Sequence, residues 1–134
     1  MFSINKDDLS ISVTRGDSIL FDIEATQGDN GLYTFEVGDK VIFKVYEKKN
    51  ASNVIIKAET VVEAPTQKVQ ISVSAQEMKD AIDVINKPLD FWYEVSLETT
   101  TETAQGQQKS VQTIIGYDDD GAKIFRVFPE GEDA

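Results

Sequence analysis

The chain has 134 residues, of which 40% are hydrophobic, and its 24 acidic against 13 basic side chains give a formal net charge of −11. This acidic excess disfavours nucleic acid and anionic membranes as partners, because binding to either requires a basic face. Cys and His are both absent, which excludes disulfides, thiol nucleophiles and serine–histidine catalysis. The length predicts a single domain over residues 1–134, and we expect neither a cofactor nor a bound metal.

The first ten residues, MFSINKDDLS, contain no basic region followed by an apolar run. We therefore expect no secretory signal at this end of the sequence. No apolar segment approaches the ~20 residues that a membrane-spanning helix requires. Both observations favour a protein that is made in the cytoplasm and does not enter a membrane.

Apolar and polar residues alternate from Leu9 to Thr14 and again from Ile19 to Glu24, which predicts two strands. Between them lies VTRGDS, which contains the Arg-Gly-Asp tripeptide that integrins recognise. An integrin ligand needs a longer, exposed loop, whereas this segment is short and flanked by strand residues. We interpret it as a hairpin turn in which Gly16 supplies a permissive backbone.

Three further strands are predicted in the first half, at Val41–Val45, Val54–Val61 and Lys68–Val73. A change of period follows, because Ser74 and Glu77 have the spacing of a helix capping box. Apolar residues then recur at intervals of three and four, and Pro88 ends the pattern. The sequence thus predicts one short helix near residues 75–86, which packs across an open end of the sheets.

The segment from Leu89 to Leu97 is the longest clean alternation in the chain. We expect a polar hairpin loop at 99–108 and two closing strands at Val111–Ile115 and Ile124–Phe128. About eight short strands separated by turns predict a mainly β fold. The predicted architecture is an antiparallel β-sandwich, immunoglobulin-like or related, with one inserted helix.

Two acidic features invite a catalytic or metal-binding interpretation. Asp118, Asp119, Asp120 and Gly121 resemble part of a calcium loop, but the full pattern requires a Glu where Pro129 stands, so a turn is the better interpretation. Acidic pairs are so frequent in this chain that none points to a carboxylate-based glycosidase, which requires a deep pocket with two acids about 5–10 Å apart. Glu94 has apolar neighbours, but its position predicts a solvated side chain on the outer face. We therefore predict that the chain is not an enzyme.

Trp92 is the most informative single residue. In the strand from Leu89 to Leu97 the apolar set occupies odd positions, so Trp92 falls on the face shared with Asp90 and Glu94. Either a loop or the helix covers it, or it anchors a contact with a protein or a sugar. Tyr46 and Tyr33 raise the same question, and these three aromatics are the candidate binding residues.

Several sequence segments follow one another in an order that is similar to that in small proteins encoded in the tail modules of Firmicute prophages. These segments are VTRGDSILFDI, GDKVIFKVYEK, VIIKAE, FWYEVSLET and QTIIGYDDDGAKIFRVFPEG. They resemble the family that includes the N-terminal β-sandwich domain of the phage baseplate upper protein. The resemblance covers nearly the whole chain, but it consists of strand-and-turn phrases and includes no catalytic signature.

This resemblance implies a non-enzymatic structural protein of a phage or prophage tail or baseplate, which acts by protein–protein contact. It further implies assembly in the bacterial cytoplasm, a place in the virion, and partners that are other tail or baseplate proteins or further copies of the chain. The alternative from another class is a carbohydrate-binding module that uses Trp92 or Tyr46 as a stacking platform. That alternative requires two or three coplanar, exposed aromatics.

Overall fold

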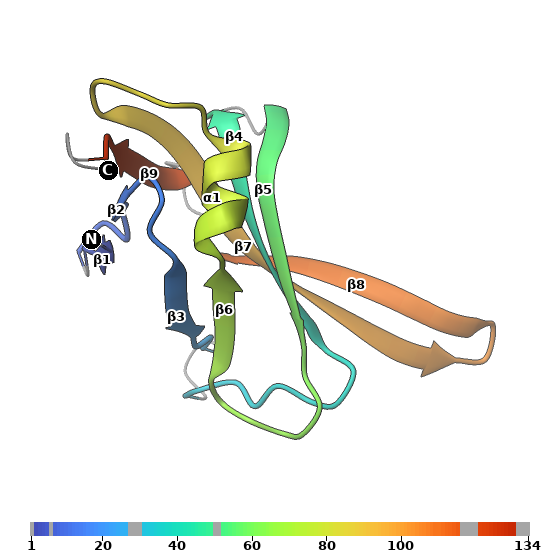
Figure 1. Ribbon diagram of the computed structural model, residues 1–134. Helices are drawn as coiled ribbons and strands as arrows, with labels where there is room; N and C mark the ends of the chain where they lie inside the picture. The colour runs from blue at the N-terminus through green and yellow to red at the C-terminus, as the bar shows by residue number, and fades with distance from the viewer. Residues whose placement is uncertain (1, 6, 27–30, 50–51, 116–120, 131–134) are drawn as a thin grey trace.

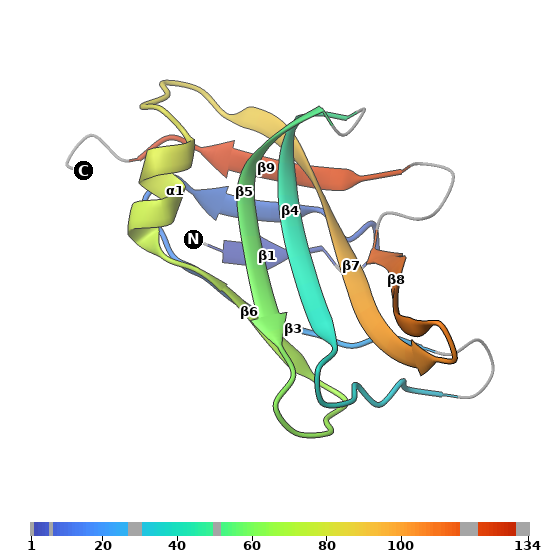
Figure 2. The same ribbon diagram turned by 90° about the vertical axis from the view of Figure 1, so that its right-hand side faces the viewer.

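The computed structural model describes residues 2–5, 7–26, 31–49, 52–115 and 121–130, and they form a mainly β fold (Figures 1 and 2). The elements follow the chain in the order β1 (Phe2–Ile4), β2 (Ile11–Thr14), β3 (Ile19–Ile23), β4 (Lys40–Lys48), β5 (Ser52–Val61), β6 (Val69–Val73), α1 (Ala75–Ala81), β7 (Leu89–Thr103), β8 (Gly106–Ile115) and β9 (Lys123–Phe128). The prediction of a sandwich-like β fold with one short helix is confirmed. The finer immunoglobulin-like assignment stays a prediction.

The strands form two sheets. The larger has the order β1-β2-β9-β7-β4-β5, and β8 also pairs with β7, while β3 and β6 form a separate antiparallel pair. In β3 the exposure alternates strictly, with Ile19, Phe21 and Ile23 buried. The ring centroids of Phe21 and of Phe43 on β4 are 5.4 Å apart, so the two sheets meet through their apolar faces.

The helix is shorter than the predicted 75–86, because the chain becomes extended at Ile82. Its start is as predicted: the Ser74 hydroxyl accepts the N–H of Glu77 at 3.0 Å, and the Glu77 carboxylate accepts the N–H of Ser74. Met78 and Ile82 are buried in the core. The helix therefore lies across one end of the two sheets, as expected from its apolar face (Figures 1 and 2).

The Arg-Gly-Asp segment is a turn, but the prediction of a hairpin is wrong. β2 pairs with β1 and β9, whereas β3 pairs with β6, so the turn carries the chain from one sheet to the other. The N–H of Asp17 donates to the carbonyl of Thr14 at 3.0 Å, and Gly16 has φ +92°. A positive φ at the third position alone is the type II pattern, whose twist separates the flanking strands instead of pairing them.

One pairing departs from the expected antiparallel arrangement. β2 and β9 run parallel, with Ile11 opposite Phe125 and Val13 opposite Val127. The ladder continues past the end of β2, where the N–H of Arg15 donates to the carbonyl of Phe128 at 2.9 Å. The larger sheet is therefore mixed, and the first and last parts of the chain lie side by side.

The polar segment at 99–108 forms a hairpin as predicted, but its assignment as a loop is wrong. β7 continues to Thr103 and β8 begins at Gly106, so nearly all of this segment is strand. β4 follows β7 only as far as Glu98. From Thr99 to Thr103, β7 is paired with β8 alone. We call residues 99–110 the arm, and Figure 1 shows it extending beyond the rest of the sheet.

Candidate contact surface

The outer face of the larger sheet carries an apolar row that crosses four strands. The register places Tyr46 opposite Trp92, and these two lie between Val54 on β5 and Ile124 on β9. Val54 and Ile124 are exposed and Trp92 is half-buried, whereas Tyr46 is only 5% exposed. Trp92 lies on the outer face beside Glu94, as its alternation predicted, whereas Tyr46 offers little surface to a ligand.

Tyr46 is held by a polar contact on the same face. Its hydroxyl donates to the carboxylate of Glu94 on the neighbouring strand. Burial raises the pKa of Tyr46 above its usual range, and the bond to Glu94 raises it further. Glu94 is half-buried, not solvated as its alternation predicted, because a cross-strand neighbour on the same face reaches it. The pair stabilises the sheet and does not project outward.

Trp92 forms one wall of a shallow hollow of about 390 Å³. Its other lining residues come from the segment before β2, the end of β4 and the start of β9: Asp7, Asp8, Ser10, Lys49, Ala122, Lys123 and Ile124. The hollow thus combines one aromatic ring with two carboxylates and two ammonium groups. This mixture suits a polar or charged ligand group beside an apolar one.

The acidic wall of the hollow is fixed by local hydrogen bonds. The side-chain oxygen of Asn5 accepts the N–H of Asp7 at 2.8 Å, and Asp8 accepts both the N–H and the hydroxyl of Ser10, at 2.9 and 2.8 Å. The bonds from Ser10 lower the pKa of Asp8, so it is ionised and unsuited to act as a general acid.

Leu9, between these residues, adopts a φ of 62°, which is unusual for a residue other than Gly. The buried Tyr93 hydroxyl donates to the Leu9 carbonyl and so holds this conformation. The side chain of Tyr93 lies on the inner face of β7, one residue from Trp92. The buried Tyr93 therefore positions the backbone between Asp8 and Ser10, which line the hollow.

Tyr33 is committed to a turn at the other end of the fold. Its hydroxyl donates to Asp39 at 2.9 Å, and the N–H of Glu36 donates to the same carboxylate oxygen at 2.9 Å. Burial and the bond to Asp39 raise the pKa of Tyr33 to about 12. The structure therefore does not bring Tyr33 together with Trp92, and its hydroxyl supports the buried Asp39.

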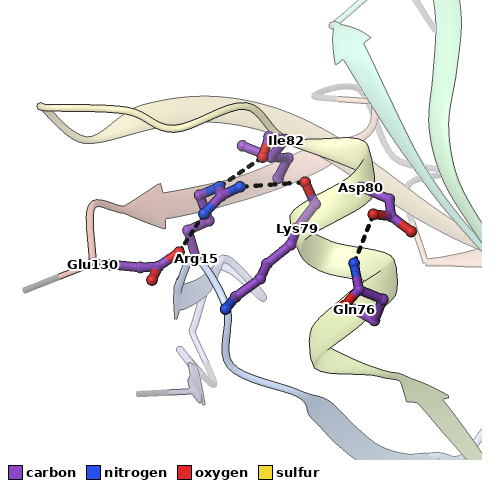
Figure 3. Close-up of polar contacts among 6 residues, drawn as sticks. All are labelled: Arg15, Gln76, Lys79, Asp80, Ile82 and Glu130. Atoms are coloured by element: carbon purple, nitrogen blue, oxygen red, sulfur yellow. Dashed lines mark hydrogen bonds and ion pairs between the residues drawn. The ribbon is translucent and has the colours of Figure 1, made fainter. Parts of the chain in front are cut away.

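Arg15 of the Arg-Gly-Asp segment is 12% exposed and is fully engaged (Figure 3). Its guanidinium donates to the carbonyl of Ile82 at 2.7 Å, to that of Lys79 at 3.4 Å, and to the carboxylate of Glu130. An arginine offered to an integrin has to project into solvent. These contacts agree with the interpretation of the tripeptide as a turn and give Arg15 a structural role that the sequence did not reveal.

The arm is the feature of this surface that the sequence reasoning missed. Every residue of β8 from Gly106 to Gln112 is exposed, so this strand of the arm has no buried face. The signal that was available is β-propensity: four threonines between positions 99 and 103 are β-branched and favour strand. Alternation of apolar and polar residues gave no such signal, because that pattern arises only in a strand that buries one of its faces.

Within the described residues, no group of three or more acidic side chains is placed to hold a metal ion. The Asp118–Asp120 cluster lies outside the described residues. Among the described helices none is long and apolar enough to cross a membrane. No family model, curated protein or solved structure matches this chain.

Proposed function

We propose that this chain is a non-enzymatic structural protein of a phage or prophage tail or baseplate and acts by protein–protein contact. The arm is the observation that carries the proposal. A two-stranded hairpin is marginally stable in water on its own, and β8 is exposed throughout the arm, so the arm is suited to gain stability from a partner. The resemblance in the order of sequence segments, from VTRGDSILFDI to the last strand, supports a role in a phage tail.

The outer-face row and the hollow beside Trp92 supply a second contact region on the same sheet. Large aromatics at a half-buried position are typical anchors of protein interfaces. The partners we propose are other tail or baseplate proteins, assembled with the chain in the bacterial cytoplasm and retained in the virion.

The test is incorporation into particles. Glu98 and Val111 are paired, so an Asn-Gly turn that replaces residues 99–110 closes the same hairpin without the arm. Phage particles purified from the bacterium that encodes the chain are analysed by quantitative mass spectrometry. We expect the wild-type chain in the particles and the armless chain to be depleted although it is folded. Particles that assemble and contain no copy of the wild-type chain would refute the proposal.

A carbohydrate-binding module is the second candidate, and the hollow is the observation that favours it. Trp92 offers a ring, and Asp7 and Lys49 offer polar groups for sugar hydroxyls. The stacking platform is incomplete, because Tyr46 is buried and Tyr33 is engaged elsewhere. A glycan array probed with wild-type protein and Trp92→Ala tests this candidate, which requires a sugar signal that the substitution removes.

A further inference from the structure

The outer edge of β8 is one of the open strand edges of the described fold. β8 pairs with β7 along one edge, and within the described residues no strand is paired along the other. An unpaired strand edge is a template for another strand, and natural proteins protect such edges with charges, prolines or bulges. Between Gln108 and Thr113 the only charged residue is Lys109, and there is no proline.

We propose that β8 pairs antiparallel with β8 of a second copy of this chain, across a two-fold axis near the middle of the strand. This inference rests on the proposed contact role of the arm, and it identifies a second copy of the chain as a partner of the arm. The product is a four-stranded sheet, ordered β7-β8-β8-β7, in which each arm gains the neighbour that its own chain does not provide. A two-fold axis perpendicular to the strands makes two identical strands antiparallel, and two-fold dimers are the commonest homo-oligomers.

Charge favours pairing through the arms over contact between the remaining parts of two copies, which we call the bodies. Each chain has a net charge of −11, so contact between two bodies is repulsive. Residues 99–110 contain one acidic and one basic side chain, Glu102 and Lys109, so the arm has no formal net charge. Pairing through the arms therefore joins the two chains at a segment that does not add to this repulsion.

The composition of β8 also suits self-pairing. Lys109 is its one charged residue, and it is paired with Glu98 of its own chain at 3.4 Å. Unless the axis passes through Lys109 itself, the two ammonium groups are not directly opposite each other, so no like charges meet. A single strand pair buries much less than the roughly 1,200–2,000 Å² of a stable interface, so we expect a weak dimer that forms at high local concentration.

The absence of cysteine provides a direct test. Single cysteines are placed in turn at Gln108, Lys109, Ser110, Val111 and Gln112, and the matched control is Ser72→Cys, an exposed position on β6. Residues directly opposite in an antiparallel pair have Cα atoms about 4.5–5.5 Å apart, which fits a disulfide. We expect one position near the axis to form disulfide-linked dimers roughly ten times faster than the control, with neighbouring positions slower.

Light scattering provides the second readout. The wild-type mass should rise from that of a monomer towards that of a dimer between about 10 µM and 1 mM, and the armless chain should stay monomeric. Ser110→Glu places two like charges near the axis and should abolish the rise, while Ser72→Glu should not. A constant monomer mass, together with cross-linking no faster than that of the control at every β8 position, overturns the inference.

The two proposals fail separately. If β8 does not pair with itself but the armless chain is depleted from particles, the arm binds a different strand and the proposed function stands. If β8 does pair with itself but the chain is absent from particles, the homotypic contact stands and the tail role falls.

Discussion

Arg15 and Ile82 lie 67 positions apart in the chain, and the guanidinium Nε of the first donates to the carbonyl of the second at 2.7 Å. Ile82 is the C-cap of α1, directly after its last residue Ala81, so a cation sits at the end of the helix that favours positive charge. The same guanidinium pairs with Glu130 after the last strand (Figure 3). One side chain thus joins the turn between the sheets, the helix and the segment that follows β9.

Replacing Arg15 should therefore destabilise the whole fold. We expect Arg15→Ala to lower the free energy of unfolding by about 2–4 kcal/mol, because Glu130 and the Ile82 carbonyl lose a charged partner in a mostly buried position. Urea denaturation followed by circular dichroism measures the change. Arg126→Ala is the control, since its exposed pair with Asp90 contributes about 1 kcal/mol or less. Equal effects of the two substitutions would contradict the assigned role of Arg15.

Removing the arm should leave the body intact. In the chain whose residues 99–110 are replaced by Asn-Gly, we expect a free energy of unfolding within about 0.5 kcal/mol of the wild type, because the exposed arm contributes no buried apolar side chain. Met78→Ala, in the core, should cost about 2–5 kcal/mol in the same assay. A large loss in the armless chain would mean that the arm belongs to the folding unit.

Stability should fall in alkali because of the buried tyrosines. Burial raises the pKa of Tyr93 above its unfolded value near 10. Above pH 10 the unfolded chain therefore releases this proton before the folded one does, and stability is lost as the pH rises further. The slope is up to about 1.4 kcal/mol per pH unit for such a group.

Urea denaturation between pH 9 and pH 11 should show a shallower decline for Tyr93→Phe than for the wild type. At pH 7 the same substitution should cost about 1–2 kcal/mol, because the Leu9 carbonyl loses its donor. Parallel pH profiles for the two proteins would contradict the assigned burial of the phenol.

Trp92 should contribute to the surface more than to the core. We expect Trp92→Ala to fold and to lose about 1–2 kcal/mol, the scale of cross-strand packing at a half-buried site. Because Trp92 is the only tryptophan, iodide quenching of its fluorescence reports its exposure directly. Failure of the variant to fold, together with a fluorophore inaccessible to iodide, would place this ring in the core.

The capping box should set the stability of the short helix. Ser74→Ala removes the acceptor of the Glu77 N–H and should lower the free energy of unfolding by about 1 kcal/mol. Ser72→Ala, two residues earlier and exposed, should change it by less than about 0.5 kcal/mol. The comparison is made by urea denaturation, and an equal effect at both positions would show that the cap does not stabilise the helix.

Local pattern determined much of this protein. Alternation at Ile19, Phe21 and Ile23 identified which side chains enter the core, because successive residues of a strand point to opposite faces. The spacing of Ser74 and Glu77 located the start of the helix, because both partners of the cap lie within one turn. The outward position of Trp92 followed from the same rule of alternation.

Only the tertiary structure decided which strands meet and what covers each face. The parallel pairing of β2 with β9 joins residues more than a hundred positions apart, and no local periodicity encodes a partner at that distance. The β8 strand of the arm shows no alternation of apolar and polar residues, because neither of its faces is buried between Gly106 and Gln112. The Tyr46 hydroxyl is bound by Glu94 of a neighbouring strand, and the Arg15 guanidinium is bound by the carbonyl of Ile82 after the helix. A sequence specifies the direction of a side chain locally, whereas burial and pairing depend on residues that folding brings together from distant positions.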